Sequence, residues 1–83
     1  MHTISVLIPD ESYKMKLIGR DAGTIRAFRE ITGVELVIDD DPAQVFLKSE
    51  EQQKLQSARR VLQEMIRARK FAKEDIRKFY GSS

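Results

Sequence analysis

A polar turn of sequence GRDAG, residues 19–23, carries the residue types in this chain that are best suited to chemistry. A turn that leads into a helix presents unpaired backbone N–H groups at the positive end of the helix dipole, which suits a phosphate. Glycine lets a ligand approach the backbone closely because it has no side chain. Arg20 lies in the turn as a candidate phosphate contact, and Lys16, Arg26 and Arg29 flank it. The turn therefore predicts a binding site for a phosphate chain.

Groups for catalysis or metal binding are scarce in the sequence. His2 is the only histidine, and no cysteine or serine triad accompanies it as a general base would require. The aspartates at 39–41 precede Pro42, a setting in which aspartate forms turns by hydrogen bonding to its own backbone. No distant carboxylate cluster completes a coordination shell around them. We therefore expect no enzyme activity, metal or cofactor for the isolated chain.

Composition predicts one small domain with an uneven charge distribution. The chain has 83 residues, 41% of them hydrophobic, and no cysteine, which fits a reducing cytoplasm. Its apolar runs are too short to span a bilayer and it has no signal-peptide pattern, so we expect no direct membrane contact. Residues 1–50 hold six Lys/Arg and nine Asp/Glu, a balance of −3, whereas residues 51–83 hold nine and four, a balance of +5. The basic second half is typical of a solvated helix face or of a surface for a polyanion.

Hydrophobic periodicity predicts the elements that position the turn. Alternating apolar residues indicate strands at about 3–8, 34–39 and 44–48 in a three-stranded antiparallel sheet, with the first strand antiparallel to the second. Helical spacing indicates helices at 13–18, from 23 to a stop at Gly33, from about 52 to 69, and at about 72–80, before a frayed end at 81–83. We expect Ser12 to cap the first helix and Ser49 to open a capping box for the long one.

The core expected from this pattern joins the sheet to the helices. Its expected members are Val34, Leu36 and Ile38 of the second strand, Phe28, the long-helix residues Leu55, Ala58, Leu62, Met65, Ile66 and Arg69 on a single face with Val61 beside them, and Ile76, Phe79 and Tyr80 packing back. Since Phe28 is placed in the core, no aromatic residue remains beside the turn. Base stacking on aromatic side chains is therefore not expected.

The segment LIGRDAGTIRAFREITGVELVIDD resembles the signature of a type I KH domain, in which an I-G-x-x-G-x-x-I pattern joins two helices. Through TGVELVIDDDPAQVFLKS and ARRVLQEMIRARKFAKEDIRKF the chain is similar to the KH domain of the ribonuclease Y family. The resemblance covers about residues 3–80. It implies an α+β fold of order β-α-α-β-β-α, a single KH domain over 1–83 with its core at about 3–70 and a short terminal helix at about 72–80.

The resemblance also implies a groove beside the turn that holds about four nucleotides of single-stranded RNA or DNA against aliphatic side chains. The candidate RNA-binding residues are Lys16, Ile18, Gly19, Arg20, Asp21, Ala22, Gly23, Ile25, Arg26 and Val37. Val37 is expected to lie opposite the core face of its strand, in the groove or on the plain surface. The long-helix arginines, Arg59, Arg60, Arg67 and Arg69, are the alternative location for binding.

Ala22 stands where the second glycine of the GXXG motif is expected, so the motif is a variant. If Ala22 begins the second helix in right-handed geometry, glycine there should cost up to about 1 kcal/mol in stability but clear a path for phosphate. The Asp21 carboxylate should repel a phosphate by on the order of 1 kcal/mol. The aspartates at 39–41 add negative charge at a rim of the groove. Weak binding that involves few phosphates is therefore predicted.

Two function classes remain open from the sequence. The first is an RNA-binding module of a ribonuclease-Y-like protein in RNA turnover, which presents RNA to a separate metal-dependent phosphohydrolase domain in a parent chain. That full-length protein would be a cytoplasmic endoribonuclease, and the sequence leaves open whether it carries a membrane anchor. The second is a degenerate KH domain that mediates docking to another protein or self-association as a homo-oligomer. The sequence leaves open whether the ligand is RNA or DNA, which bases are preferred, the oligomeric state and whether Met1 is a natural start.

Overall fold

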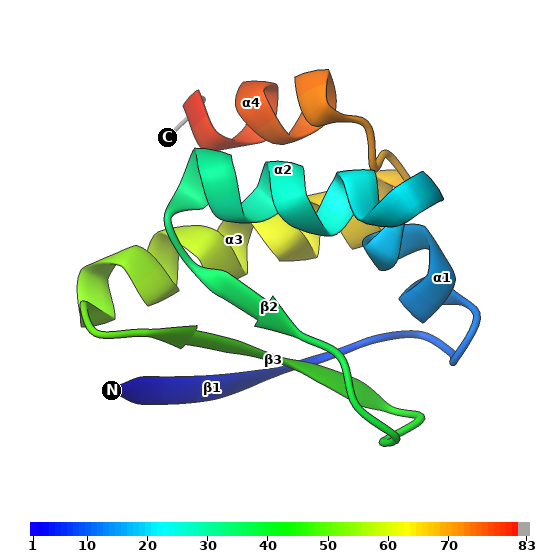
Figure 1. Ribbon diagram of the computed structural model, residues 1–83, viewed down its shortest axis with the longest axis horizontal. Coiled ribbons are helices and arrows are strands. Elements are labelled where there is room, and N and C mark those ends of the chain that lie inside the picture. Colours follow the sequence, from blue (N-terminus) through cyan, green and yellow to red (C-terminus); the bar gives the residue numbers. More distant parts are fainter. Residues whose placement is uncertain (82–83) are drawn as a thin grey trace.

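The computed structural model describes residues 1–81 and shows a sheet with helices stacked on one face (Figure 1). Its elements are β1 (His2–Leu7), α1 (Tyr13–Ile18), a 3₁₀ turn η1 (Arg20–Ala22), α2 (Gly23–Thr32), β2 (Glu35–Val37), β3 (Gln44–Ser49), α3 (Gln52–Ala68) and α4 (Lys73–Gly81). The expected β-α-α-β-β-α order is confirmed, and α4 is the expected terminal helix. Gly81 belongs to α4 rather than to a frayed end, and the rest of that predicted end lies outside the described residues.

The sheet has three strands in the order β1-β3-β2, and β3 pairs antiparallel with both neighbours. The register places Val6 of β1 opposite Val45, and Leu36 of β2 opposite Leu47. The antiparallel sheet is therefore confirmed. The expectation that the first strand runs antiparallel to the second is wrong, because β1 and β2 lie on opposite sides of β3 and must then run in the same direction.

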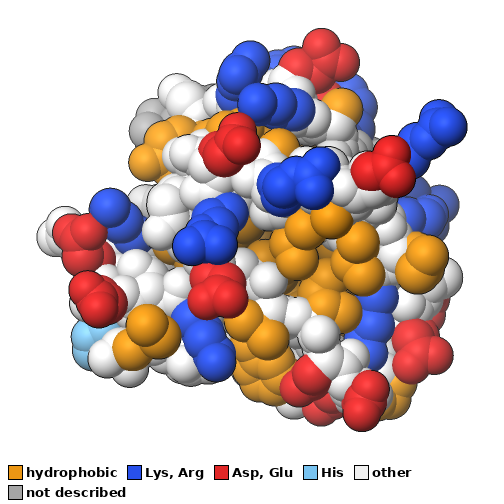
Figure 2. Space-filling view, viewed as in Figure 1, with side chains coloured by type: hydrophobic (Ala, Val, Ile, Leu, Met, Phe, Trp, Pro, Cys, Tyr) orange, Lys and Arg blue, Asp and Glu red, His pale blue; other side chains and the backbone are white. Residues whose placement is uncertain are grey.

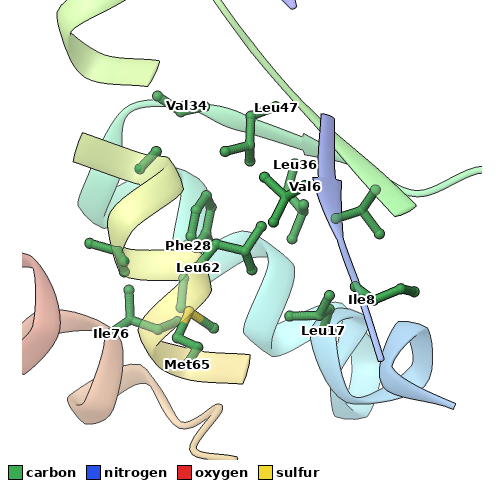
Figure 3. Packing of buried hydrophobic residues seen from close by; sticks show 14 of the residues in the cluster. Val6, Ile8, Leu17, Phe28, Val34, Leu36, Leu47, Leu62, Met65 and Ile76 are labelled. Atoms are coloured by element: carbon green, nitrogen blue, oxygen red, sulfur yellow. The ribbon is translucent and has the colours of Figure 1, made fainter. Parts of the chain in front are cut away.

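The core lies between the sheet and the helices, as the alternation in the strands requires (Figure 3). The buried members include Val6, Ile8, Val34, Leu36, Val45 and Leu47 from the sheet side, and Phe28, Leu55, Ala58, Val61, Leu62 and Met65 from α2 and α3. Burying each large apolar side chain stabilises the fold by about 1.5–3 kcal/mol. The predicted face of the long helix is confirmed except at Arg69, which follows α3 and is exposed.

Helix α4 forms a further layer on the side of α2 and α3 that faces away from the sheet (Figure 1). Ile76 is fully buried there and Phe79 is partly buried, as expected, whereas Tyr80 is 40% exposed. The guanidinium of Arg60 donates a hydrogen bond to the backbone oxygen of Phe79 at 3.3 Å, and Lys73 Nζ lies 3.2 Å from Glu30 Oε2. The terminal helix is thus attached to both of its neighbours.

The helix ends differ from the sequence expectation on the N-terminal side. Ser12 precedes α1 but makes no side-chain capping bond; instead its N–H (2.8 Å) and its hydroxyl both donate to Asp10 Oδ1. Helix α3 begins after Glu51, whose N–H donates to Ser49 Oγ at 3.1 Å, so the predicted capping box is wrong. Serine and aspartate close local turns of this kind in competition with caps. The predicted stop of α2 is confirmed, since Gly33 adopts the left-handed conformation at φ +73°.

Candidate nucleic-acid interface

Gly19 makes the sharp corner between α1 and the turn. Its backbone has φ +78° and ψ 174°, and its N–H donates to the Met15 oxygen at 2.9 Å. A Cβ atom built at this position would overlap Thr24 Oγ1 and lie 2.7 Å from the Thr24 nitrogen. The start of α2 therefore approaches the turn so closely that only glycine fits.

Asp21 and Ala22 both adopt the left-handed conformation, with φ +55° and φ +60°. The condition of right-handed geometry at Ala22 is not met, because right-handed backbone resumes only at Gly23, with φ −66°. The Ala22 N–H donates to the Gly19 oxygen at 3.3 Å and closes the turn. Alanine in this conformation is strained and glycine is not, so the expected stability effect of Ala22→Gly changes sign.

Thr24 holds the beginning of α2 to a distant part of the chain. Its hydroxyl donates a hydrogen bond to the backbone oxygen of Phe71 at 3.1 Å. Phe71 lies between α3 and α4, and its ring meets that of Tyr13 edge-on, with centroids 6.2 Å apart. Sequence reasoning missed this contact because nothing local to Thr24 indicates a partner 47 residues away.

A shallow pocket of about 180 Å³ lies beside the turn, between α2 and β2. Its lining residues are Ile25, Arg26, Arg29, Glu35 and Leu36. Figure 2 shows apolar surface below α2, with basic side chains above it and acidic side chains toward the connection of β2 and β3. The pocket thus offers an aliphatic floor, two guanidinium groups and one carboxylate, which suits a flat polar ring next to an anionic chain.

The predicted site residues divide into four groups. The turn brings together Gly19, Arg20, Asp21, Ala22 and Gly23, with both charged side chains exposed. Ile25 and Arg26 line the pocket. Lys16 and Ile18 lie on α1 before the turn, with Lys16 Nζ 5.2 Å from the centroid of the Tyr13 ring. Val37 stands apart, because it pairs with Phe46 on the sheet face opposite to that of Leu36.

Three lining residues are absent from the predicted RNA-binding residues: Leu36, Glu35 and Arg29, of which Arg29 is predicted only to flank the turn. Leu36 was expected in the core, and it is indeed 4% exposed while it also forms part of the pocket floor. The alternation along β2 could have indicated Leu36. A residue on the helix-facing side of an edge strand also faces the space between that strand and the neighbouring helix. Glu35, the first residue of β2, also lines the pocket, and nothing in the sequence pattern indicated this.

The acidic connection between β2 and β3, at residues 38–43, is a turn closed by aspartate side chains, as its sequence predicts. Asp39 accepts a hydrogen bond from the Asp41 N–H at 2.9 Å. Asp41 accepts from the Ala43 N–H at 2.9 Å and from Gln44 Nε2 at 2.8 Å, and these bonds, in that order, lower the pKa of the Asp41 carboxyl. Within residues 1–81 no group of three or more His, Cys, Asp or Glu side chains is arranged to hold a metal ion.

Lys14 ties this connection to α1 and was missed from the sequence. Its side chain is 9% exposed, and its Nζ donates to the backbone oxygen of Asp39 at 2.5 Å. Burial of a lysine requires such a partner, because an unpaired charge in the interior is costly. Lys14 therefore fixes the connection between β2 and β3 relative to α1.

Asp10 lies in the connection between β1 and α1. Hydrogen bonds from the hydroxyl and N–H of Ser12 lower the pKa of its carboxyl, and the charges of Lys16 and Arg69 lower it further. The charges of Lys16 and Arg69 thus both act on this carboxylate although 53 positions separate the two residues. No helix in the described part of the chain has both the length and the apolar character that crossing a membrane requires.

Comparison with known proteins agrees with this arrangement. The KH domain family matches residues 3–64. Ribonuclease Y of Fervidobacterium nodosum is 43% identical over 65 residues, which cover 77% of this chain and 13% of that protein. Ribonuclease Y of Thermobifida fusca is 33% identical over 79 residues, which cover 95% of this chain and 16% of that protein. The chain therefore matches only a small part of these relatives.

A solved structure shows the same fold at lower sequence similarity. The crystal structure of Dim2p from Pyrococcus horikoshii OT3 superposes with a TM-score of 0.75 at 22% identity, covering 99% of this chain and 50% of that one. Its similarity concerns the fold alone. With the family match, the variant I-G-x-x-G-x-x-I turn and the β-α-α-β-β-α order, the chain belongs to the KH domain family of nucleic-acid-binding modules.

Proposed function

We propose that this chain binds single-stranded RNA and presents it to a separate catalytic domain of a ribonuclease-Y-like protein. The observation that carries the proposal is the turn at 19–23, which leads directly into α2 beside the pocket between α2 and β2. Backbone N–H groups at the start of α2 and the exposed Arg20 side chain receive the phosphates. Bases lie against the aliphatic side chains of Ile25 and Leu36 rather than on aromatic rings.

The charges around the groove favour weak binding. Arg26 and Arg29 line the pocket and attract an anionic strand, whereas the exposed Asp21 carboxylate stands in the turn itself. The aspartates of the hairpin connection add negative charge at the far rim. A strand held in this way contacts few phosphates, so its affinity depends only shallowly on salt.

Cleavage chemistry belongs, in this proposal, to a part of the parent protein outside this chain. The ribonuclease Y relatives are six to nine times longer than the region they share with it, since the match covers 11–16% of their length. In that part, a metal-dependent phosphohydrolase domain would act on RNA that the KH domain holds. The full-length protein would lie in the cytoplasm, with a membrane anchor as an option for attaching it to the membrane. The KH domain itself contributes affinity and position.

The binding proposal is tested with Arg20→Ala in a titration of a labelled, unstructured single-stranded RNA at low and moderate salt. For the unsubstituted chain, the logarithm of the binding constant should fall with the logarithm of the salt concentration with a slope of about −0.7 per phosphate contacted. Arg20→Ala should weaken binding about fivefold because one phosphate contact is lost. Arg77→Ala, which removes an exposed charge from α4, is the matched control and should change affinity less than twofold. A single-stranded DNA of the same sequence shows whether the 2′-hydroxyl contributes.

Two outcomes contradict the proposal. If Arg20→Ala is silent while substitutions at Arg59, Arg60 or Arg67 weaken binding, the site lies on α3 instead. If the parent binds neither RNA nor DNA at low salt, the alternative of a protein-interaction module becomes the better account. Leu7, 75% exposed on the edge strand β1, would then mark the surface to examine, since uncovered edge strands pair readily with other chains.

A further inference from the structure

Basic residues gather where α3 ends and α4 begins. Arg67 lies in the last turn of α3, Arg69 and Lys70 follow it, and Lys73 begins α4, all with exposed side chains. Among residues 1–81, neither Arg69 nor Lys70 forms an ion pair. This junction lies at the same end of the molecule as the turn between α1 and α2 (Figure 1). Its charge is therefore available beside the proposed site.

Specific contacts fix the junction to the turn. Thr24, five residues after Gly19, donates its hydroxyl hydrogen bond to the Phe71 oxygen at 3.1 Å. The Phe71 ring packs edge-on against Tyr13 at 6.2 Å, and Lys16 Nζ lies 5.2 Å from the centroid of the same Tyr13 ring. Lys16, the turn and the junction thus belong to one connected surface rather than to parts that move independently.

The backbone at the junction supports a role for the Arg69 side chain. Arg69 adopts the left-handed conformation with φ +56° and ψ 44°, and its N–H donates to the Ile66 oxygen at 3.3 Å. The Lys70 N–H donates to the Met65 oxygen at 3.1 Å, which completes a helix ending in which glycine is the favoured residue at this position. Stabilisation of the helix dipole explains a basic residue in the last turn, such as Arg67, but not an arginine in a strained conformation.

We propose that Arg69 and Lys70 form a second phosphate-contact site, which extends the nucleic-acid interface from the turn to the α3–α4 junction. The inference rests on the proposed function and adds a length requirement to it. A strand of about four nucleotides fills the groove and the turn, whereas a longer single strand also reaches the junction. The Asp10 carboxylate, on which the charges of Lys16 and Arg69 both act, repels phosphate and limits the affinity that the junction adds.

The test compares oligonucleotides of about four and about ten nucleotides, labelled, single-stranded and of mixed sequence, with the double variant Arg69→Gly/Lys70→Ala. Glycine is suited to the left-handed backbone at position 69, so the variant should fold at least as stably as the parent. Its binding of the longer RNA should weaken about fivefold to tenfold, and the salt slope should become shallower by about 1.4, for two lost phosphates. Binding of the short RNA should change less than twofold.

The matched control is Arg77→Ala/Lys78→Ala, which removes the same charge from exposed positions of α4 and should leave both affinities within twofold. The inference is overturned if the junction variant and this control bind the longer RNA equally well. It is also overturned if the junction variant binds short and long RNA more weakly by the same factor. The junction would then affect binding in the groove instead of contacting the additional length of the longer strand. If the unsubstituted chain binds neither the short nor the long RNA, the proposed function itself fails, which is a distinct result.

Discussion

Replacement of Gly19 by alanine is expected to lower the free energy of unfolding by about 3 kcal/mol. The added Cβ atom would overlap the Thr24 hydroxyl and lie 2.7 Å from the Thr24 backbone nitrogen, which belongs to α2 and cannot move alone. The backbone at Gly19 also has φ +78°, a region that alanine rarely adopts. Moving Thr24 would in turn disturb its hydrogen bond to Phe71. Urea unfolding followed by circular dichroism measures the loss.

Gly23→Ala is the matched control for this prediction. Gly23 lies four residues later at the beginning of α2, in right-handed geometry with φ −66° and ψ −40°. A Cβ atom there meets nothing within 4 Å. Alanine should therefore stabilise the protein by about 0.4–1 kcal/mol, because it restricts the unfolded chain without straining the folded one. Equal stability of the two variants would show that Thr24 does not press against the turn as described.

The double variant Asp21→Asn/Ala22→Gly is expected to be more stable than the parent by about 1 kcal/mol and to bind single-stranded RNA roughly tenfold more tightly at low salt. Glycine relieves the left-handed strain at position 22, where φ is +60°, and removes a methyl group from the path of the strand. Asparagine tolerates the left-handed conformation of position 21 and removes the repulsive charge. Thermal unfolding and RNA titration measure the two effects.

Salt separates the two contributions to affinity. The gain from Asp21→Asn alone should shrink at moderate salt, because the repulsion it relieves is screened, whereas the gain from Ala22→Gly alone should persist. A double variant less stable than the unsubstituted chain would mean that Ala22 is right-handed in solution. Absence of binding by both parent and double variant at low salt would contradict the nucleic-acid proposal for the isolated domain.

Elements that depend on periodicity could be predicted from the sequence. The helix at 13–18 has the predicted bounds, and Gly33 ends α2 as expected. The buried face of α3 also follows directly from apolar spacing, because burial of these side chains dominates the energetics of a small domain. The predicted position of the turn between α1 and α2 is likewise confirmed, since glycine and charged residues interrupt both helices there.

Features that depend on backbone strain or distant contacts could not be predicted. Alanine favours right-handed helical geometry, so its left-handed conformation at position 22 becomes visible only when the approach of α2 is known. The Lys14 contact to Asp39 and the Thr24 contact to Phe71 join residues 25 and 47 positions apart. The assignment of Val37 rather than Leu36 to the groove assumed that a core residue cannot also line a pocket, and Leu36 does both.

The central claim is that the turn at 19–23 and the pocket between α2 and β2 bind a single strand together. An NMR titration of the ¹⁵N-labelled chain with a short single-stranded RNA tests it most directly, because each backbone amide reports its own surroundings. The account predicts the largest shift changes at the amides of residues 19–24, with smaller changes at Ile25, Arg26 and Leu36 and none at the outer sheet residues Leu7 and Phe46. Changes confined to the outer face of the sheet, or to α3 without the turn, would contradict it.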